Sequence, residues 1–241
     1  MIDTVLFDLD GTLLQFSQGA FLGAYVTELK KVFAKLNMDP DASVKAIMAS
    51  TKDMMSNNGS MLNSQKFWES FVDYLKLTPE ERRKIETACD TFYVSEFNVV
   101  RSVMKPNDIS RRLVKALAVK GYTIVLATNP LFPSCAVTTR LDWIGLTPCD
   151  FKFITHYANS KYCKPNPEYY HEVFKQINKK PDQCIMVGNS PSDDMCAGLL
   201  GTETFLVADY IENETGVDIA AYRQGALADL ETYLMSLPNI K

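Results

Sequence analysis

The chain lacks several features that would place it in a specialised class. Its six cysteines include no Cys-x-x-Cys pair, and its two histidines, His156 and His171, match no metal-ligand spacing. No apolar stretch is long enough to span a bilayer. The basic residues are scattered, and the net charge is -4 with a pI of about 5.3. We therefore expect a protein that uses neither nucleic acid nor a membrane as a partner.

The chain also lacks a charged n-region followed by a long apolar segment at its start, because the first residues already read as a core strand. Together with the isolated cysteines, this favours a cytoplasmic, reducing environment. The sequence contains no signal for an oligomeric state.

What is present is enough apolar material for a full core, with 46% hydrophobic residues in 241. After about residue 105, short apolar runs alternate with helical patterns. Strands are predicted over residues 123–127, 151–155, 184–187 and 204–207, and helices near 107–120, 133–144, 166–178 and 193–200. A closing helix is predicted near 224–236. This rhythm predicts an α/β fold with a doubly wound, mostly parallel sheet and helices on both faces.

Between the first strand and this regular region lies a segment of different character. Amphipathic helices are predicted near residues 18–36, 40–53, 64–76 and 79–98. We expect residues 1–15 and 106–241 to form the α/β core and residues 16–105 to form an inserted helical bundle. Its two joints, near 14–17 and 105–107, would permit a hinge.

Asp8 and Asp10 follow the apolar run Val5 to Phe7, where the predicted strand gives way to glycine. Carboxylates two apart on a strand leave it on the same face, so their repulsion must be relieved by a cation, a shared proton or a turn that re-aims one of them. A divalent metal is the simplest of these. A solvated acidic turn is the simpler alternative, but the buried strand before the pair favours an active site.

Two further positions, one at a strand end and one at a loop-to-helix junction, carry groups suited to an anion. Thr128, with the following Asn129 N–H, stands at the end of the second predicted strand, where open α/β folds bind ligands, although such a turn is also common loop chemistry. Lys164 precedes a proline-rich helix start and could neutralise a phosphate or a carboxylate. Lys161 is close in sequence but lacks the Lys-Pro context.

The strand predicted over residues 184–187 runs into Gly188-Asn189-Ser190-Pro191-Ser192-Asp193-Asp194. Mg²⁺ prefers hard oxygen ligands, so one or two carboxylates from the first strand with Asn189, Asp193 or Asp194 would suffice to bind it. The alternative is an N-capping loop for the next helix.

The order of these motifs, Asp-x-Asp-Gly-Thr, then Thr, then Lys-Pro, then Gly-Asn-x₃-Asp-Asp, closely resembles the haloacid dehalogenase superfamily of phosphohydrolases. The resemblance covers residues 1 to about 15 and about 105 to 210. It implies a Rossmann-like core, and the insert position matches that family's helical cap of the C1 type.

The resemblance implies roles for these residues. Asp8 would be the nucleophile that forms an aspartyl phosphate, and Asp10 the general acid and base. Thr128, the Asn129 amide and Lys164 would hold the phosphoryl oxygens. Mg²⁺ would be bound by the Asp8 carboxylate, the Asp10 carbonyl and the later acidic loop.

One departure from the family pattern is Asn189, because many members carry aspartate directly after the glycine of the fourth motif. An amide oxygen still ligates Mg²⁺, but the site loses one negative charge. Asp193 or Asp194 would make up for it, and we favour Asp194 because some relatives show a Gly-Asn-x₄-Asp pattern.

The expected function is Mg²⁺-dependent hydrolysis of a small phosphorylated metabolite. The dehalogenase branch typically lacks the second aspartate, so Asp10 favours a phosphatase; a mutase or a receiver domain finds no local support. A non-catalytic protein that binds a phosphorylated metabolite or a protein partner is the rival from another class. Candidates to line the substrate pocket are Phe16, Phe21, Tyr25, Lys45 and Lys52, although bundle packing and solvated charge would also explain them.

Overall fold

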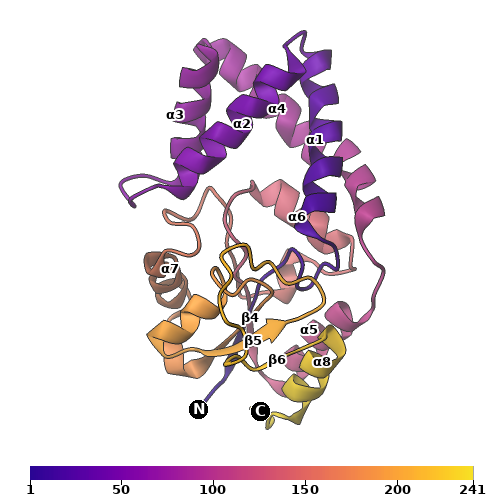
Figure 1. Cartoon of the computed structure of the whole chain (residues 1–241), viewed down its shortest axis with the longest axis vertical. Coiled ribbons are helices and arrows are strands. Elements are labelled where there is room, and N and C mark those ends of the chain that lie inside the picture. Colours follow the sequence, from indigo (N-terminus) through magenta and orange to yellow (C-terminus); the bar gives the residue numbers. More distant parts are fainter. Residues whose placement is uncertain (241) are drawn as a thin grey trace.

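The computed structural model describes residues 1–240, and its sheet has six strands that all run parallel (Figure 1). The strands lie in the order β3-β2-β1-β4-β5-β6. Their bounds are β1 Thr4–Phe7, β2 Thr123–Leu126, β3 Phe153–Ile154, β4 Cys184–Gly188, β5 Glu203–Val207 and β6 Gln224–Gly225. The strand order reverses between β1 and β4, which is where open α/β sheets bind ligands. The predicted α/β class is confirmed.

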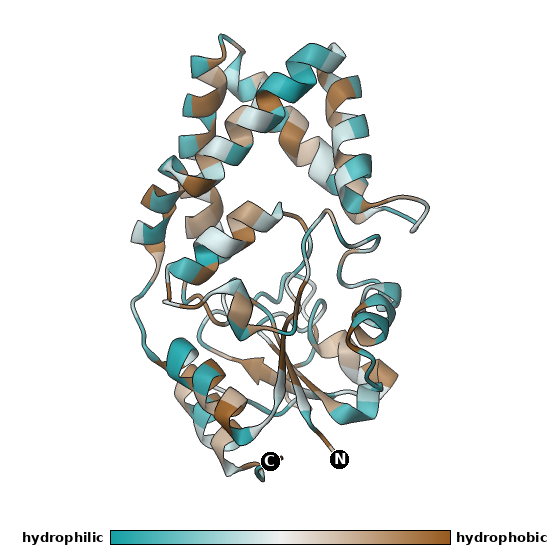
Figure 2. Ribbon diagram, turned by 180° about the vertical axis from the view of Figure 1, so that it is seen from behind, coloured by the Kyte–Doolittle hydropathy of each residue, from teal (hydrophilic) through white to brown (hydrophobic). Residues whose placement is uncertain are grey.

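Helices cover both faces of this sheet because alternate strand residues point to opposite sides. Val5 and Phe7 belong to the hydrophobic cluster that includes α5, α6 and α8, whereas Leu6 belongs to the cluster formed with α7. The helical segments of the core are α5 Ile109–Lys120, α6 Ser134–Asp142, η2 Pro148–Asp150, α7 Pro167–Ile177, η3 Pro181–Gln183, η4 Met195–Leu200 and α8 Leu227–Ser236. In Figure 2 the strands are brown, and the helices around them alternate brown and teal, as expected for helices with one buried face.

The register of the sheet brings three strand ends to one level. Phe7 of β1 lies beside Leu126 of β2 and Val187 of β4. The residues that follow these three positions therefore leave the sheet together, at its carboxyl edge. This register is what gathers the polar groups that the sequence places after separate strands.

Five helical segments between β1 and β2 lie at the opposite end of the molecule from the two termini, beyond the carboxyl edge of the sheet (Figure 1). They are α1 Gln18–Lys35, α2 Pro40–Met55, α3 Asn63–Leu75, α4 Pro79–Val94 and η1 Glu96–Val103. The two chain segments that join them to the sheet lie side by side, because the Lys105 N–H donates to the Gln15 carbonyl at 2.7 Å.

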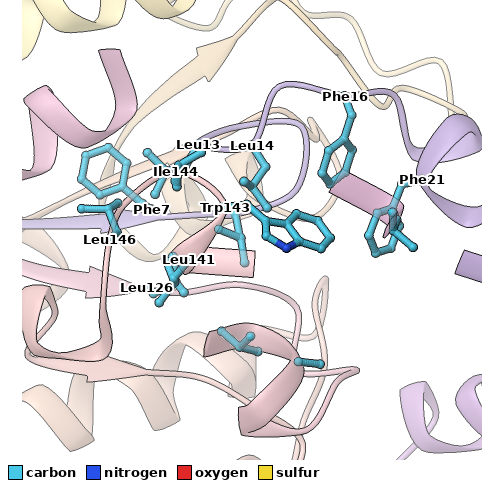
Figure 3. Close-up of a cluster of buried hydrophobic side chains, with 14 of the residues drawn as sticks. Phe7, Leu13, Leu14, Phe16, Phe21, Leu126, Leu141, Trp143, Ile144 and Leu146 are labelled. Atoms are coloured by element: carbon cyan, nitrogen blue, oxygen red, sulfur yellow. The ribbon is translucent and has the colours of Figure 1, made fainter. Parts of the chain in front are cut away.

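The core continues from the sheet into the helical end. Figure 3 shows Phe7 and Leu126 of the sheet near Leu13 and Leu14, with Phe16 and Phe21 further along the same cluster. Phe16 and Phe21 stack with ring centroids 4.9 Å apart. The apolar packing is therefore continuous across the two connecting segments.

Several predicted elements have different bounds or a different type. The helix expected near 79–98 ends at Val94 and is followed by a 3-10 helix, and the segment near 193–200 is 3-10 rather than α. The strand expected over 151–155 is only Phe153–Ile154. The closing helix begins at Leu227, because residues 224–225 pair with the end of β5 instead. Each difference arises from long-range pairing or loop packing, which local periodicity does not report.

Candidate active site

Asp8 stands directly after β1, in the position where the strand leaves the sheet. Its N–H donates to the Val187 carbonyl at 2.8 Å, so the backbone is still held by β4. Its carboxylate is buried but lines a cavity. One oxygen, Oδ1, accepts a hydrogen bond from Lys164 Nζ at 3.0 Å, and the other lies 3.4 Å from the Thr12 hydroxyl.

Lys164 reaches this carboxylate from the loop before α7. Its side chain is 1% exposed, and Nζ also lies 2.6 Å from Asp194 Oδ1. Burial by itself would lower the pKa of Lys164, but Asp194 and Asp8 raise it well above its usual range. Lys164 is therefore a charged ammonium between two carboxylates. Lys161, three residues earlier, is exposed.

Asp194 comes from the loop after β4 and is also fully buried. Its Oδ2 accepts the Ser190 N–H at 3.0 Å. The carboxylate packs so closely against Gly188 that a Cβ there would lie 2.1 Å from Asp194 Cγ. The pKa of Asp194 is raised by burial, and Lys164 opposes that rise. Glycine at position 188 is thus required for Asp194 to meet Lys164.

Asn129 links the strand-two and strand-four loops. Its side-chain Oδ1 accepts the Lys164 N–H at 3.2 Å, and its Nδ2 donates to Asp193 Oδ2 at 3.2 Å. Thr128, directly before it, is buried, and its carbonyl accepts hydrogen bonds from the hydroxyls of Thr155 and Tyr169. Both residues line the same cavity as Asp8.

Asn189 takes the place where the sequence departs from the family pattern. Its Nδ2 donates to the Tyr210 carbonyl at 2.6 Å, which turns Oδ1 towards the Thr12 hydroxyl, 3.2 Å away. It packs on Gly11, whose φ of +76° suits glycine, and a Cβ at Gly11 would lie 2.2 Å from Asn189 Nδ2. The Asn189 amide oxygen is therefore oriented beside Asp8.

Asp10 forms an ion pair with Arg140, a residue that sequence reasoning missed. Arg140 lies on α6 with no exposed surface, and its guanidinium stands 4.4 Å from the ring centroid of Phe132. Burial raises the pKa of Asp10, and Arg140 opposes that rise. The available signal was an arginine at a buried-face position of a helix, next to Ala136 and Leu141, where a charge requires a partner.

Glu212, in the loop after β5, is a second residue that the sequence did not single out. It lines the cavity, and its N–H donates to the Asn189 carbonyl at 3.0 Å. Burial, with the charges of Asp8 and Asp10, raises the pKa of Glu212 to about 8. No motif marks it, because it lies in an irregular loop.

The donors at this edge fit a hard divalent cation. Asp10 Oδ1 is buried with no hydrogen-bond partner among residues 1–240, and the carboxylates of Asp8 and Asp10 add to the effect of burial in raising the pKa of Glu212. No group of three or more His, Cys, Asp and Glu side chains in the described chain is arranged to hold a metal alone. A metal site here therefore requires amide or main-chain oxygens, as Asn189 and Asp10 offer.

The cavity above these groups has a volume of about 230 Å³ and extends into the helical end. Phe16, Phe21 and Tyr25 line it, as expected for pocket residues. Lys45 and Lys52 do not: both are exposed on α2, so that part of the prediction is wrong. They lie on the solvent face of an amphipathic helix, which sequence pattern alone did not distinguish from its cavity face.

Residues 2–199 match a family model described as a haloacid dehalogenase-like hydrolase. The pyrophosphatase PpaX of Bacillus cereus (strain G9842) is 19% identical over 236 residues, which cover 98% of this chain and 96% of that protein. None of the helices in residues 1–240 has the length and apolar character needed to cross a membrane.

Two solved structures illustrate the fold. The HAD-hydrolase YfnB from Bacillus subtilis, bound to magnesium, has a TM-score of 0.60 at 21% identity, with 97% of this chain and 99% of that chain covered. The L-2-haloacid dehalogenase from Xanthobacter autotrophicus has a TM-score of 0.56 at 14% identity, with 98% and 100% covered. At these identities the likenesses show the fold, which phosphatases and dehalogenases share.

Proposed function

Because the chain belongs to the haloacid dehalogenase-like hydrolases, we propose that it is a Mg²⁺-dependent phosphohydrolase that cleaves a small phosphomonoester through an aspartyl phosphate. Asp10 is the observation that carries this proposal. Cleavage of a phosphoester needs a proton for the leaving alcohol, whereas displacement of a halide does not. A second carboxyl group, lining the same cavity as Asp8, supplies that proton.

Asp8 is the proposed nucleophile. Its Oδ1 is hydrogen-bonded to Lys164 at 3.0 Å, whereas Oδ2 has only the longer contact with the Thr12 hydroxyl at 3.4 Å, so Oδ2 is the oxygen proposed to attack phosphorus. The Lys164 ammonium offsets the charge that gathers as a phosphoryl group approaches. The Thr128 hydroxyl and the Asn129 N–H are the proposed donors to the phosphoryl oxygens.

Asp10 is the proposed general acid and base. Arg140 holds Oδ2, which leaves Oδ1 without a protein partner to carry the proton. Burial favours the protonated form that the first step needs. After the alcohol leaves, the same carboxylate deprotonates the water that hydrolyses the aspartyl phosphate.

The proposed ligands for Mg²⁺ are the Asp8 carboxylate, the Asp10 carbonyl and the Asn189 amide oxygen. When bound there, the metal stabilises negative charge on the phosphoryl oxygens. Asp194 is already bonded to Lys164 and Ser190, so we assign it to hold Lys164 and to meet the metal through water. Asp193 then supplies the negative charge that Asn189 lacks.

We further propose that residues 1–15 and 106–241 form the core domain and that residues 16–105 act as its lid. The first turn of α3 contacts the core beside the site: the N–H groups of Asn63 and Ser64 donate to the carbonyls of Ser160 and Tyr157 at 2.9 and 2.8 Å. Opening the lid would break these bonds.

The absence of disulfides among the described cysteines supports a reducing, cytoplasmic location.

The test is release of phosphate from acetyl phosphate, a substrate small enough to require only the core. With MgCl₂ we expect turnover by the native chain and none by Asp8→Asn. Because acetate leaves without a proton, the expected fall of about 10²–10⁴-fold for Asp10→Asn reports its role as the base for the attacking water. Calorimetry should show that Asp10→Asn still binds Mg²⁺ through its main-chain oxygen. Phosphate binding without turnover by the native chain would instead favour the non-catalytic, metabolite-binding alternative.

A further inference from the structure

The cavity has two chemically different ends. The carboxylates and Lys164 line the sheet end, whereas aromatic rings dominate the lid end. Six of these rings belong to Phe16, Phe21, Tyr25, Trp68, Phe71 and Phe132. They pack in two groups: Tyr25 and Phe132 meet edge to face with centroids 5.6 Å apart, and Trp68 and Phe71 do so at 5.7 Å. These rings therefore form an apolar wall at the lid end of the cavity before any ligand binds.

No basic side chain lines the lid end among the described residues; the Arg82 guanidinium stacks on the Trp68 ring, 5.2 Å from its centroid, and Arg140 is paired with Asp10. Lys164 is the single basic residue among the described cavity-lining residues, and two carboxylates already occupy it. The one charged group at the lid end is Asp90, an exposed carboxylate on α4. A second phosphate or a carboxylate on the substrate would therefore be buried without a partner, which is strongly unfavourable.

Hydrogen-bonding side chains are a minority there: Gln18, Thr51, Asp90 and Tyr157 line the cavity among a larger number of apolar residues. The hydroxyls of Tyr25 and Tyr93 are bonded to each other at 2.7 Å. Trp68 is 8% exposed, and its Nε1–H has no hydrogen-bond partner among residues 1–240. A polyol would leave several of its hydroxyls unsatisfied against these rings.

From these observations, and resting on the proposed phosphohydrolase function, we propose the substrate class: a phosphomonoester whose alcohol part is uncharged and largely apolar, of about the size of one aromatic ring. The phosphate lies at Lys164 and Asp8, and the apolar part lies against Phe21, Tyr25 and Trp68. An apolar cavity of roughly 150 Å³ holds one benzene molecule. A volume of about 230 Å³ therefore accommodates a ring together with a phosphoryl group.

This class excludes substrates that carry a second anion or many hydroxyls, such as phosphoglycolate, pyrophosphate and sugar phosphates. Their extra polar groups would meet the aromatic wall or the carboxylates around Asp8. An apolar group gains from the same surroundings, since burial of a ring removes it from water.

The experiment compares kcat/KM for benzyl phosphate, phosphoglycolate and glucose 6-phosphate, with acetyl phosphate as the reference for the core chemistry. We expect kcat/KM for benzyl phosphate to exceed the values for phosphoglycolate and glucose 6-phosphate by about 100-fold or more, because a site discriminates strongly against a substrate whose polar groups it leaves unpaired. Calorimetry with benzylphosphonate and phosphonoacetate measures the same preference without turnover.

A matched pair of variants tests whether the lid end sets this preference. Thr51→Arg places a guanidinium at a cavity-lining, half-buried position of α2, whereas Thr27→Arg makes the same change on the exposed surface of α1. We expect Thr51→Arg to weaken benzylphosphonate binding about tenfold and to strengthen phosphonoacetate binding by a similar factor. Thr27→Arg should leave both unchanged.

The outcomes separate the two proposals. The enzyme could hydrolyse acetyl phosphate but show a kcat/KM for phosphoglycolate or glucose 6-phosphate that equals or exceeds the value for benzyl phosphate. That result overturns the apolar substrate class and leaves the proposed phosphohydrolase function intact. Tighter binding of phosphonoacetate than of benzylphosphonate overturns it as well. No hydrolysis of acetyl phosphate overturns the proposed function, and the phosphonate comparison then still decides the chemistry of the cavity.

Discussion

Lys164 is the buried cation on which the stability of the carboxylate cluster depends. Its side chain is 1% exposed, and its Nζ is bonded to Asp8 at 3.0 Å and to Asp194 at 2.6 Å. Lys164→Met keeps the length of the side chain but leaves two buried carboxylates without their cation. Removing one partner of such a pair costs about 3–5 kcal/mol, chiefly through the charge left behind.

The loss is measured by urea unfolding of metal-free protein in EDTA. With an m value of about 2–3 kcal/mol per molar urea, the midpoint of Lys164→Met should fall by roughly 1–2 M. Lys161→Met is the matched control, since that lysine is exposed three residues away, and its midpoint should stay near that of the native chain. Adding Asp194→Asn to Lys164→Met should restore part of the stability, because it removes one stranded charge.

The stability lost in Lys164→Met, relative to the native chain, should depend on pH because of Asp194. Burial already raises its pKa, and loss of Lys164 removes the group that opposes the rise. A carboxyl group with a raised pKa in the folded state loses stability as pH increases from its unfolded value, about 3.9, through the folded value. The deficit of Lys164→Met should therefore be larger at pH 8 than at pH 5. Equal midpoints for the Lys164 and Lys161 variants at pH 8 would refute the reasoning.

Three further predictions concern other parts of the molecule. Gly188→Ala should cost about 1–3 kcal/mol in urea unfolding and abolish phosphate release, because the new Cβ would overlap Asp194; an active, fully stable variant would contradict this packing. Dialysis against EDTA should stop hydrolysis and MgCl₂ should restore it, and undiminished turnover in EDTA would exclude a metal requirement. Arg112 holds the pKa of Glu231 below its usual value, so this contact stabilises the fold above about pH 4.3 and is lost as pH falls through the lowered pKa. Glu231→Gln should thus lower the urea midpoint slightly at pH 7 and leave it unchanged at pH 2. The same midpoint as the native chain at both pH values would show that the contact between Arg112 and Glu231 does not stabilise the fold.

Much of the architecture could be read from local pattern. Apolar runs with flanking turns located β1, β2, β4 and β5, and amphipathic spacing located α1 to α5 with small errors at their ends. The short strand β6 escaped notice, since two residues carry no periodicity and acquire their structure only by pairing with β5.

Much of the candidate site could be predicted from the sequence because its residues directly follow strands. Asp8, Thr128 and Asn189 each follow a strand, and parallel strands in register end at one edge, so their nearness follows from the fold class. The same argument does not reach Arg140, whose guanidinium arrives from the buried face of a helix, or Glu212, which arrives from a loop.

The sequence by itself determined most of the elements, their order and the polar groups that directly follow strands at the carboxyl edge, because each of these depends on residues close together in the chain. Only the tertiary structure decided which charges meet and what surrounds the ligand: Arg140 on Asp10, Lys164 between two carboxylates, and an aromatic cavity without a free cation. The physical reason is that these contacts join residues more than a hundred positions apart in most cases, and packing of whole elements, rather than any local preference, sets their distances.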